Sequence, residues 1–273
     1  MVTSMSDHRE TPPPAVVVER DQGVATLRLS RPESMNSLDI ATKEQLLAAV
    51  REVAHDETVR CVVLTGTGRA FCVGQDLKEH VELLQTNGAA MWTTVREHYN
   101  PVVQLISTMR KPVLAAINGV AAGAGASLAF ACDLRIMAQE AGINTSFAGI
   151  ALSCDTGASW HLPRLVGVAR AKELLLLPRT VPADECLRLG LATQVVPGVE
   201  LEATVSELAH RLAAGPTMAY GCIRAAVGYS ATHCLSESLE NEARFMAETG
   251  ASADHRAAVD AFLAKRPPEF TGR

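Results

Sequence analysis

The sequence lacks the patterns that mark nucleic-acid-binding, metal-binding and disulfide-bonded proteins. Its formal net charge is −5, its aromatic content is 4%, and no basic stripe interleaves with aromatic side chains, so nucleic acid is not expected as a partner. The seven cysteines are scattered, odd in number and without a C-x-x-C pair, which favours reduced thiols in a cytoplasmic protein over a disulfide framework or a zinc site. The eight histidines form no H-E-x-x-H motif, and we expect no metal site.

A cleavable leader and a membrane span are not expected either. The segment "MVTSMSDHRETPPP" has no apolar core and contains acidic residues, so we interpret residues 1–14 as a disordered tail. Residues 112–132 carry no charge and are numerous enough to cross a membrane. However, eight of these 21 residues are alanine, three are glycine, and Asn118-Gly119 breaks the run. This composition favours a buried strand, a turn and a helix poor in side chains.

Hydrophobic patterning predicts an α/β core followed by a helical region. Two β-rich runs flank the hairpin signal Asp21-Gln22-Gly23, and the apolar spacing after Asp39 predicts an amphipathic helix with Asp39 as its N-cap. Strands then alternate with helices, which favours a parallel sheet buried by helices. We expect the core to span 15–195 and the C-terminal helical region to span 196–273. The later helices are predicted at 168–177, 182–189, 200–213, 216–228, 234–249 and 253–264.

Two glycine-containing segments share one design, because each follows a buried strand and precedes a helix. They are "RAFCVGQDLKE" (69–79) and "NGVAAGAGAS" (118–127). Backbone amides at such turns are not used by the helix and can point at a ligand oxygen, assisted by the helix dipole. Two such turns side by side would form an oxyanion hole for a carbonyl that becomes an enolate. The alternative for each is an ordinary strand-to-helix turn. A dinucleotide-binding interpretation is weak, because Leu128 replaces the third glycine of G-x-G-x-x-G.

These motifs, in this order, resemble those of the crotonase, or enoyl-CoA hydratase/isomerase, superfamily. The resemblance extends over about residues 15–273 and includes "RPESMNSLD" (31–39), "KPVLAAINGVAAGAGASLAFACDLRI" (111–136), "LPRLVGVARAKELLL" (162–176) and "FLAKRPPEFTGR" (262–273). It implies an α/β, ClpP/crotonase-like ββα spiral core with a C-terminal helical region that mediates trimer formation. It further implies an enzyme that acts on an acyl-CoA thioester as a homotrimer or hexamer, with no cofactor beyond the CoA of its substrate.

The resemblance also implies which residues bind the substrate. The backbone amides of Gln75 and Ala124 would hold the thioester oxygen, and alanine can replace the usual glycine because only its N–H is used. Lys265 would either reach phosphates or remain a solvated lysine at a helix end. The segment near the CoA adenine would contain Met35, Ser37 and Leu38. The remaining residues expected along the CoA and acyl path are Asp76, Leu77, Lys78, Gly123, Ser127 and Phe147.

The two glutamates of a typical hydratase are missing. Such enzymes have one Glu two residues after the last glycine of the second motif, where this sequence has Ser127. The second Glu lies about 20 residues further on, where an ungapped count reaches Phe147, and no acidic residue occurs from 141 to 154. Hydration requires one group to deprotonate water and another to protonate carbon, work that suits two positioned carboxylates. We therefore do not expect efficient hydratase activity.

One acidic residue remains in the right region, Asp155 in "SCDTGASWHLPRLVG". Superfamily members with Asp before this turn include the ring-epoxyphenylacetyl-CoA isomerases and, through "DT-x-x-S", the 4-chlorobenzoyl-CoA dehalogenases. Asp155 would then be a general base or a nucleophile, with N-capping of the next helix as the structural alternative. Cys154, Ala158 and Trp160 would partly desolvate it and raise its pKa. Trp160 would wall the acyl pocket or belong to the core, and His161 is expected to be structural.

The expected function is a double-bond isomerase that acts through an enolate. Gln75 and Ala124 would supply the oxyanion hole, and Asp155 would take a proton from the acyl chain and return it elsewhere. Three alternatives remain open. They are an enoyl-CoA hydratase that uses Asp155 with water, an aryl-CoA dehalogenase-like hydrolase, and a non-catalytic acyl-CoA binder.

Overall fold

The strands of the protein form two sheets in a computed structural model that describes residues 13–86 and 92–273. The larger sheet has the order β1 (Val16–Asp21), β2 (Val24–Leu29), β3 (Cys61–Gly66), β5 (Val113–Ile117), β7 (Leu134–Ala138) and β10 (Gln194–Val196). The smaller sheet has the order β4 (Ala70–Cys72), β6 (Val120–Ala122), β8 (Gly142–Asn144) and β9 (Thr180–Pro182). Most of the expected tail at 1–14, and part of the expected helical segment at 77–110, lie outside the described residues.

The chain passes back and forth between the two sheets as it advances. The neighbours β3, β5 and β7 are parallel in the larger sheet. The strands that follow them, β4, β6 and β8, are parallel neighbours in the smaller sheet. Every residue of β3 and β5 is buried, as expected for strands covered on both faces. This alternation is the ββα spiral that the resemblance implies.

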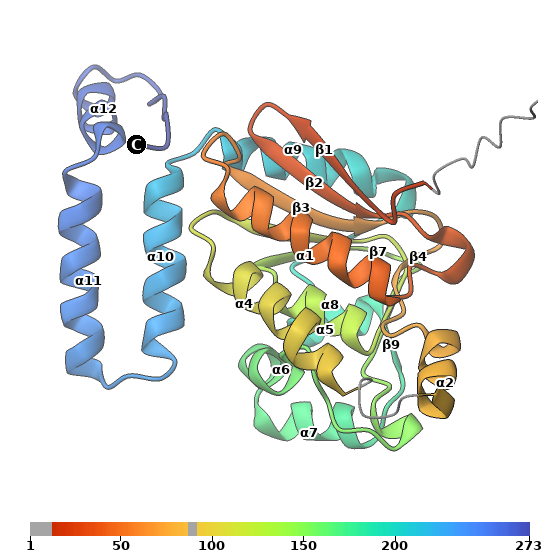
Figure 1. Cartoon of the computed structure of the whole chain (residues 1–273). Helices are drawn as coiled ribbons and strands as arrows, with labels where there is room; N and C mark the ends of the chain where they lie inside the picture. The colour runs from red at the N-terminus through yellow and green to blue at the C-terminus, as the bar shows by residue number, and fades with distance from the viewer. Residues whose placement is uncertain (1–12, 87–91) are drawn as a thin grey trace, which may run out of the picture.

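Helices cover both faces of the larger sheet. The helices of the main body are α1 (Ile40–His55), α2 (Leu77–Thr86), α4 (Asn100–Thr108), α5 (Ala124–Ala131), α6 (Ala158–Val166), α7 (Val168–Leu176), α8 (Ala183–Leu189) and α9 (Leu201–Ala213). A π-helical turn, η2 (Val95–Tyr99), leads directly into α4. In Figure 1, α1 crosses in front of the larger sheet and α9 lies behind it, so the core is enclosed between them.

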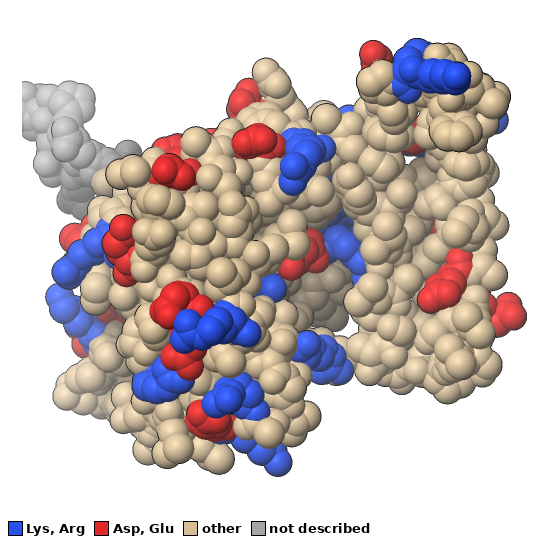
Figure 2. All heavy atoms as spheres, turned by 180° about the vertical axis from the view of Figure 1, so that it is seen from behind, with Lys and Arg blue, Asp and Glu red and all other residues tan. Residues whose placement is uncertain are grey.

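The last three helices form an arm that stands apart from the body. They are α10 (Thr217–Ser230), α11 (Leu235–Gly250) and α12 (Ala253–Leu263) (Figure 1). Most of the visible surface of the arm is uncharged, whereas on the body Lys and Arg lie among Asp and Glu (Figure 2). The first helix of the expected C-terminal region, α9, packs on the sheet instead. The boundary between a core ending at residue 195 and a C-terminal region starting at residue 196 remains a prediction.

Local patterns predicted most elements correctly. Asp39 is the N-cap of α1, because its carboxylate accepts a hydrogen bond from the Thr42 amide at 2.8 Å. The uncharged stretch 112–132 contains β5, β6 and α5 rather than one long helix. Within the described residues, no helix is long and apolar enough to span a membrane.

Candidate active site

A cavity of about 470 Å³ opens between the start of α1, the β4–α2 turn, η2 and the segment before α6. Gln75, Ala124 and Asp155 all line it, although they come from three distant parts of the chain. Leu77 and Phe147 contribute apolar wall. The cavity therefore brings together the three residues for which the sequence suggests a chemical role.

The two glycine turns lie against each other because β4 and β6 are paired. A Cβ atom added to Gly74 would lie 2.9 Å from the Ala122 carbonyl oxygen and 3.1 Å from the Ala124 amide nitrogen. A Cβ added to Gly125 would lie 2.1 Å from the Cys72 carbonyl oxygen. Gly74 also has a φ of +84°, a conformation that favours glycine. Glycine at these positions allows the two backbones to approach closely.

The amides of Gln75 and Ala124 are free to bind a ligand oxygen. Neither donates a hydrogen bond to an acceptor among the described residues. Leu38 fixes the Gln75 peptide from outside, since its N–H donates to the Gly74 carbonyl at 2.8 Å and its carbonyl accepts from the Asp76 N–H at 3.2 Å. Ala124 is the first residue of α5, where an amide has no partner within the helix and the dipole favours negative charge.

Asp155 lies half-buried in a strained turn before α6. Thr156, a β-branched residue, has a φ of 52° and donates a hydrogen bond from its hydroxyl to the Asp155 carboxylate at 2.8 Å. Burial raises the pKa of Asp155, although the Thr156 hydroxyl and the charge of Lys43 oppose this shift. The N-cap of α6 is Gly157, and no side chain caps the helix. The alternative role of Asp155 as a helix cap is therefore wrong.

The segment 31–39 is fastened by Asn36, whose side chain is fully buried. The Asn36 amide donates to the Thr67 and Ala70 carbonyl oxygens at 3.0 and 2.8 Å, and its oxygen accepts from the Arg31 N–H at 2.9 Å. Met35 and Asn36 have φ angles of 54° and 56°. Two successive left-handed residues without glycine are costly, and this bonding holds them in place.

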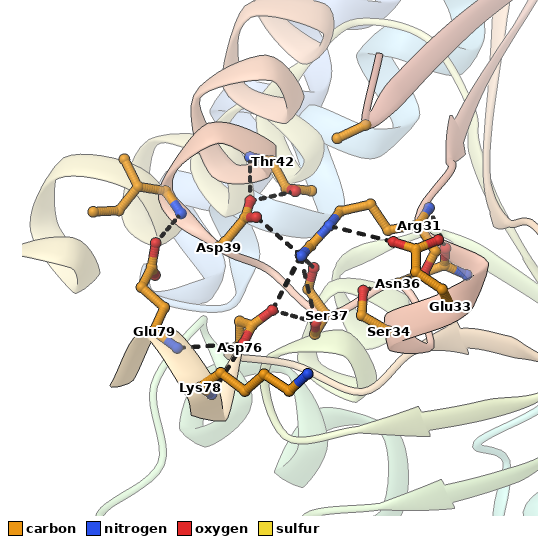
Figure 3. Close-up of polar contacts among 12 residues, drawn as sticks. Arg31, Glu33, Ser34, Asn36, Ser37, Asp39, Thr42, Asp76, Lys78 and Glu79 are labelled. Carbon is orange, nitrogen blue, oxygen red and sulfur yellow. Dashed lines mark hydrogen bonds and ion pairs between the residues drawn. The ribbon is translucent and has the colours of Figure 1, made fainter. Parts of the chain in front are cut away.

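A second anchor, Asp76, joins this segment to the β4–α2 turn (Figure 3). One carboxylate oxygen of Asp76 accepts hydrogen bonds from Ser37 at 2.8 Å and from the Arg31 guanidinium at 3.2 Å. Its other oxygen accepts from the Lys78 and Glu79 amides at the start of α2. Although burial raises the pKa of Asp76, the hydrogen bonds from these groups lower it below its usual value. Asp76 therefore stabilises the β4–α2 turn and does not line the cavity.

Known proteins with similar sequences and structures agree with this geometry. The family model described as enoyl-CoA hydratase/isomerase matches residues 19–273. The chain belongs to this family. A "Probable enoyl-CoA hydratase" of Rhodobacter capsulatus is 44% identical over 255 residues, which are 93% of this chain and 97% of that protein. The 1,2-epoxyphenylacetyl-CoA isomerase of Escherichia coli is 41% identical, with the same coverage of 93% and 97%.

The same likeness extends to three dimensions. A crystal structure from Mycobacterium abscessus described as an enoyl-CoA hydratase/isomerase superimposes with a TM-score of 0.92. It is 43% identical and covers 95% of this chain and 100% of its own. The protein thus has the crotonase fold and is an enzyme of the enoyl-CoA hydratase/isomerase family that acts on an acyl-CoA thioester.

Against this family background, neither glutamate position of a typical hydratase supplies an acid. Ser127 is fully buried in α5, and its hydroxyl donates to the Gly123 carbonyl oxygen at 3.0 Å. Phe147 lines the cavity with its ring. Of the described residues that line the cavity, the carboxylates are Glu44, Glu97 and Asp155, and the first two are exposed.

The structure disperses the other expected binding residues. Gly123 and Leu77 line the cavity, whereas Lys78 is exposed and does not belong to the lining. Trp160 lies outside the cavity lining, is 42% exposed and stacks under the Arg164 guanidinium at 3.4 Å. Lys265 is exposed on the arm beyond α12. In the segment that was expected to lie near the CoA adenine, the side chains of Ser37 and Leu38 are buried and that of Met35 is half-buried.

His161 has a partner that the sequence did not reveal. Its Nε2 lies 3.2 Å from the Ser107 hydroxyl of α4. Burial, with help from nearby arginines, lowers the pKa of His161 to about 4. A neutral imidazole between two helices agrees with the structural role expected for it.

A polar cluster centred on Lys43, most of it in the cavity lining, could not be recognised from the sequence. The cluster consists of Lys43, Gln75, Glu79, Thr94 and Tyr99. The residue spacing in α1 could have revealed Lys43. It stands three and four residues before the buried Leu46 and Leu47, so it falls on the apolar face of the helix. Within the described ranges, no group of three or more His, Cys, Asp and Glu side chains could hold a metal ion.

Proposed function

We propose that the protein is a double-bond isomerase of acyl-CoA thioesters with Asp155 as its general base. The observation that carries this proposal is the combination of one half-buried carboxylate with two free amides around the same cavity. The two positions that hold glutamates in a typical hydratase are Ser127 and Phe147. A single acid that takes a proton and gives it back suits isomerisation better than hydration, which needs a second proton-transfer group.

The proposed reaction moves one proton and requires nothing else. The thioester oxygen binds between the Gln75 and Ala124 amides, which stabilise the negative charge that develops on it. Asp155 removes a proton from one carbon of the acyl chain, and the electron pair passes into the enolate. The enolate then takes a proton back from the protonated Asp155 at another carbon, so the double bond shifts and the carboxylate is regenerated. In D₂O the acidic hydrogen of the protonated Asp155 exchanges with solvent before this step, so that deuterium enters the product. CoA belongs to the substrate, and we propose no metal or redox cofactor.

Hydration with Asp155 as the base is the second candidate, because the Rhodobacter capsulatus relative is named as a hydratase. A test that separates the two follows carbon-bound deuterium and added water in one experiment. The protein is incubated in D₂O with phenylacetyl-CoA, which can form an enolate but cannot add water, and with crotonyl-CoA and 3-hexenoyl-CoA. Mass spectrometry then measures uptake at each carbon and any gain of water.

We expect deuterium in phenylacetyl-CoA at the α-carbon, and conversion of 3-hexenoyl-CoA to its 2-enoyl isomer without added water. Formation of 3-hydroxyacyl-CoA from crotonyl-CoA at a comparable rate would instead assign the protein to the hydratases. A covalent adduct between Asp155 and the ring of added 4-chlorobenzoyl-CoA, with release of chloride, would support the dehalogenase-like alternative. Tight binding of all three thioesters without any deuterium exchange would contradict enolate chemistry. It would instead support the alternative of a non-catalytic acyl-CoA-binding protein.

We further propose that the arm mediates assembly into a homotrimer or hexamer, as the resemblance implies. Large apolar side chains on α10, α11 and α12 are exposed in the single chain, and another protein surface usually covers such a patch. They are Ile223, Val227, Leu235, Leu239, Met246, Phe262 and Leu263. Sedimentation equilibrium is expected to give three or six chain masses, and a mass of 29.0 kDa would contradict this proposal.

A further inference from the structure

Lys43 occupies a position that is unfavourable for a lysine in two ways. Its side chain is buried, with 2% of the residue exposed, and removing an ammonium group from water is costly. It also stands in the first turn of α1, where the positive end of the helix dipole repels a cation. A leucine or methionine would fit the apolar face without either cost. The lysine therefore needs an explanation beyond packing.

The ammonium of Lys43 has an acceptor for each of its three hydrogens. Nζ lies 2.9 Å from the Thr94 hydroxyl, 3.2 Å from the Gln75 side-chain oxygen and 3.5 Å from a Glu79 carboxylate oxygen. None of the three acceptors lies on α1: Thr94 immediately precedes η2, Gln75 lies in the β4–α2 turn, and Glu79 lies in the first turn of α2. Lys43 thus connects the first turn of α1 to the start of η2 and to the turn that leads into α2.

Gln75 is held in one orientation by this arrangement. Its side-chain oxygen accepts from Lys43 and from the Tyr99 hydroxyl at 2.7 Å, and its side-chain nitrogen donates to Glu79 at 3.2 Å. Gln75, whose backbone amide has no acceptor among the described residues, is therefore held at its side chain as well. Tyr99, which is buried, also lines the cavity, so its ring is fixed by the same contacts.

Lys43 is also the one lysine or arginine among the described residues that line the cavity. Its ion-pair partner Glu79, at 3.5 Å, is not part of that lining. In a site shielded from water, a fixed positive charge favours the anionic forms of both the base and the enolate.

We propose that Lys43 is a positioning residue for the reaction: it holds the Gln75 side chain and the Tyr99 hydroxyl, and it supports the negative charge of Asp155 and of the enolate. This inference rests on the proposed function, since it assumes that Asp155 is the base. Lys43 acts through these groups and transfers no proton itself.

The charged and titratable groups around Asp155 agree with this role. Burial raises the pKa of Asp155, and Lys43 on α1 opposes that shift. Burial and the nearby Asp155 charge both raise the pKa of Tyr99 on η2, which keeps the phenol neutral. The other titratable groups lining the cavity are Glu44 on α1, His80 on α2, and Glu97 and His98 on η2. Lys43 is therefore the cation of the cavity lining that opposes the effect of burial on the pKa of Asp155.

Lys43→Met tests the inference, with Lys111→Met as a matched control. Lys111 is also buried, but its ammonium donates to the Val53 and Asp56 carbonyl oxygens, away from the cavity. With phenylacetyl-CoA in D₂O, we expect Lys43→Met to lower the maximal exchange rate about tenfold to a hundredfold. We also expect its acid limb to move up by about one pH unit, because the charge that favours the Asp155 carboxylate is gone. Lys111→Met should lower the melting temperature without changing either value.

Tyr99→Phe separates the positioning of Gln75 from the effect of the Lys43 charge. It also provides a test if Lys43→Met does not fold. This variant removes the hydrogen bond to Gln75 but leaves the Lys43 cation in place. We expect a several-fold slower exchange with an unmoved acid limb. The inference is overturned if Lys43→Met folds and keeps the wild-type rate and acid limb, or if Tyr99→Phe exchanges at the wild-type rate. Full exchange by Asp155→Asn would instead overturn the proposed function itself, so the two failures are distinguishable.

Discussion

Replacing Asp155 with asparagine should slow deuterium uptake at the α-carbon of phenylacetyl-CoA by about a thousandfold, the scale of a lost general base. Asparagine has nearly the same shape, and its side-chain oxygen can still accept the hydrogen bond that Thr156 donates at 2.8 Å. The substitution therefore removes basicity and little else. Uptake is measured by mass spectrometry in D₂O, and binding of phenylacetyl-CoA is measured separately by calorimetry.

Glu97→Gln is the matched control for this experiment. Glu97 lines the same cavity but is exposed, and its carboxylate accepts a hydrogen bond from Thr93 at 3.0 Å. Its neutralisation should leave the exchange rate within a few-fold of wild type, because an exposed charge is well screened. If Asp155→Asn exchanged as fast as the wild type while binding the thioester equally well, Asp155 would not be the base.

The pH dependence of the wild-type exchange rate provides a second test of Asp155. The base must be ionised to accept a proton, so the rate falls when the pH drops through the pKa of Asp155. Burial raises that pKa, and the acid limb is therefore expected above the value of about 3.9 for an unperturbed aspartate. The residual exchange rate of Asp155→Asn should not show this fall at low pH. An acid limb at or below the ordinary aspartate range would contradict burial of the base.

Gly74→Ala should lower the exchange rate about a hundredfold, the scale expected for the loss of one oxyanion donor. The new Cβ would lie 2.9 Å from the Ala122 carbonyl oxygen and 3.1 Å from the Ala124 amide nitrogen, so the two turns must move apart. The φ of +84° adds strain for any residue with a Cβ. We expect the free energy of unfolding to fall as well, by about 1–3 kcal/mol. Stopped-time mass spectrometry and thermal melting measure the two effects.

Gly149→Ala provides the control, because a Cβ at Gly149 would meet no atom within 4 Å. Gly149 lies in the short helical turn Ala148–Ile150, near the cavity but away from both amides. It should change neither the rate nor the stability beyond about 0.5 kcal/mol. If Gly74→Ala kept the wild-type exchange rate, the Gln75 and Ala124 amides would not form the oxyanion hole.

Two aspartates before helices illustrate how far sequence reasoning can go. Asp39 and Asp155 each precede a predicted helix, and the sequence allowed both to be N-caps. Asp39 caps α1 through the Thr42 amide, as predicted. Asp155 does not cap α6, because Thr156 and Gly157 adopt left-handed conformations, with φ of 52° and 75°, that move its carboxylate away from the helix start. Two such residues in succession cannot be inferred from propensity, since Thr avoids this conformation.

The sequence by itself determined the local features of this protein. Apolar periodicity and turn residues set the strands of the larger sheet, most helices and the two glycine turns, because these depend on neighbours only a few residues away. The four short strands of the smaller sheet were not predicted. The order of the motifs was enough to indicate the family. Only the tertiary structure decided which side chains share a cavity, because that depends on the pairing of β4 with β6 and on the packing of α1 against the β4–α2 turn and η2. Lys43 shows the difference, since its place on an apolar helix face was visible in the sequence, and its three acceptors exist only once distant segments have packed together.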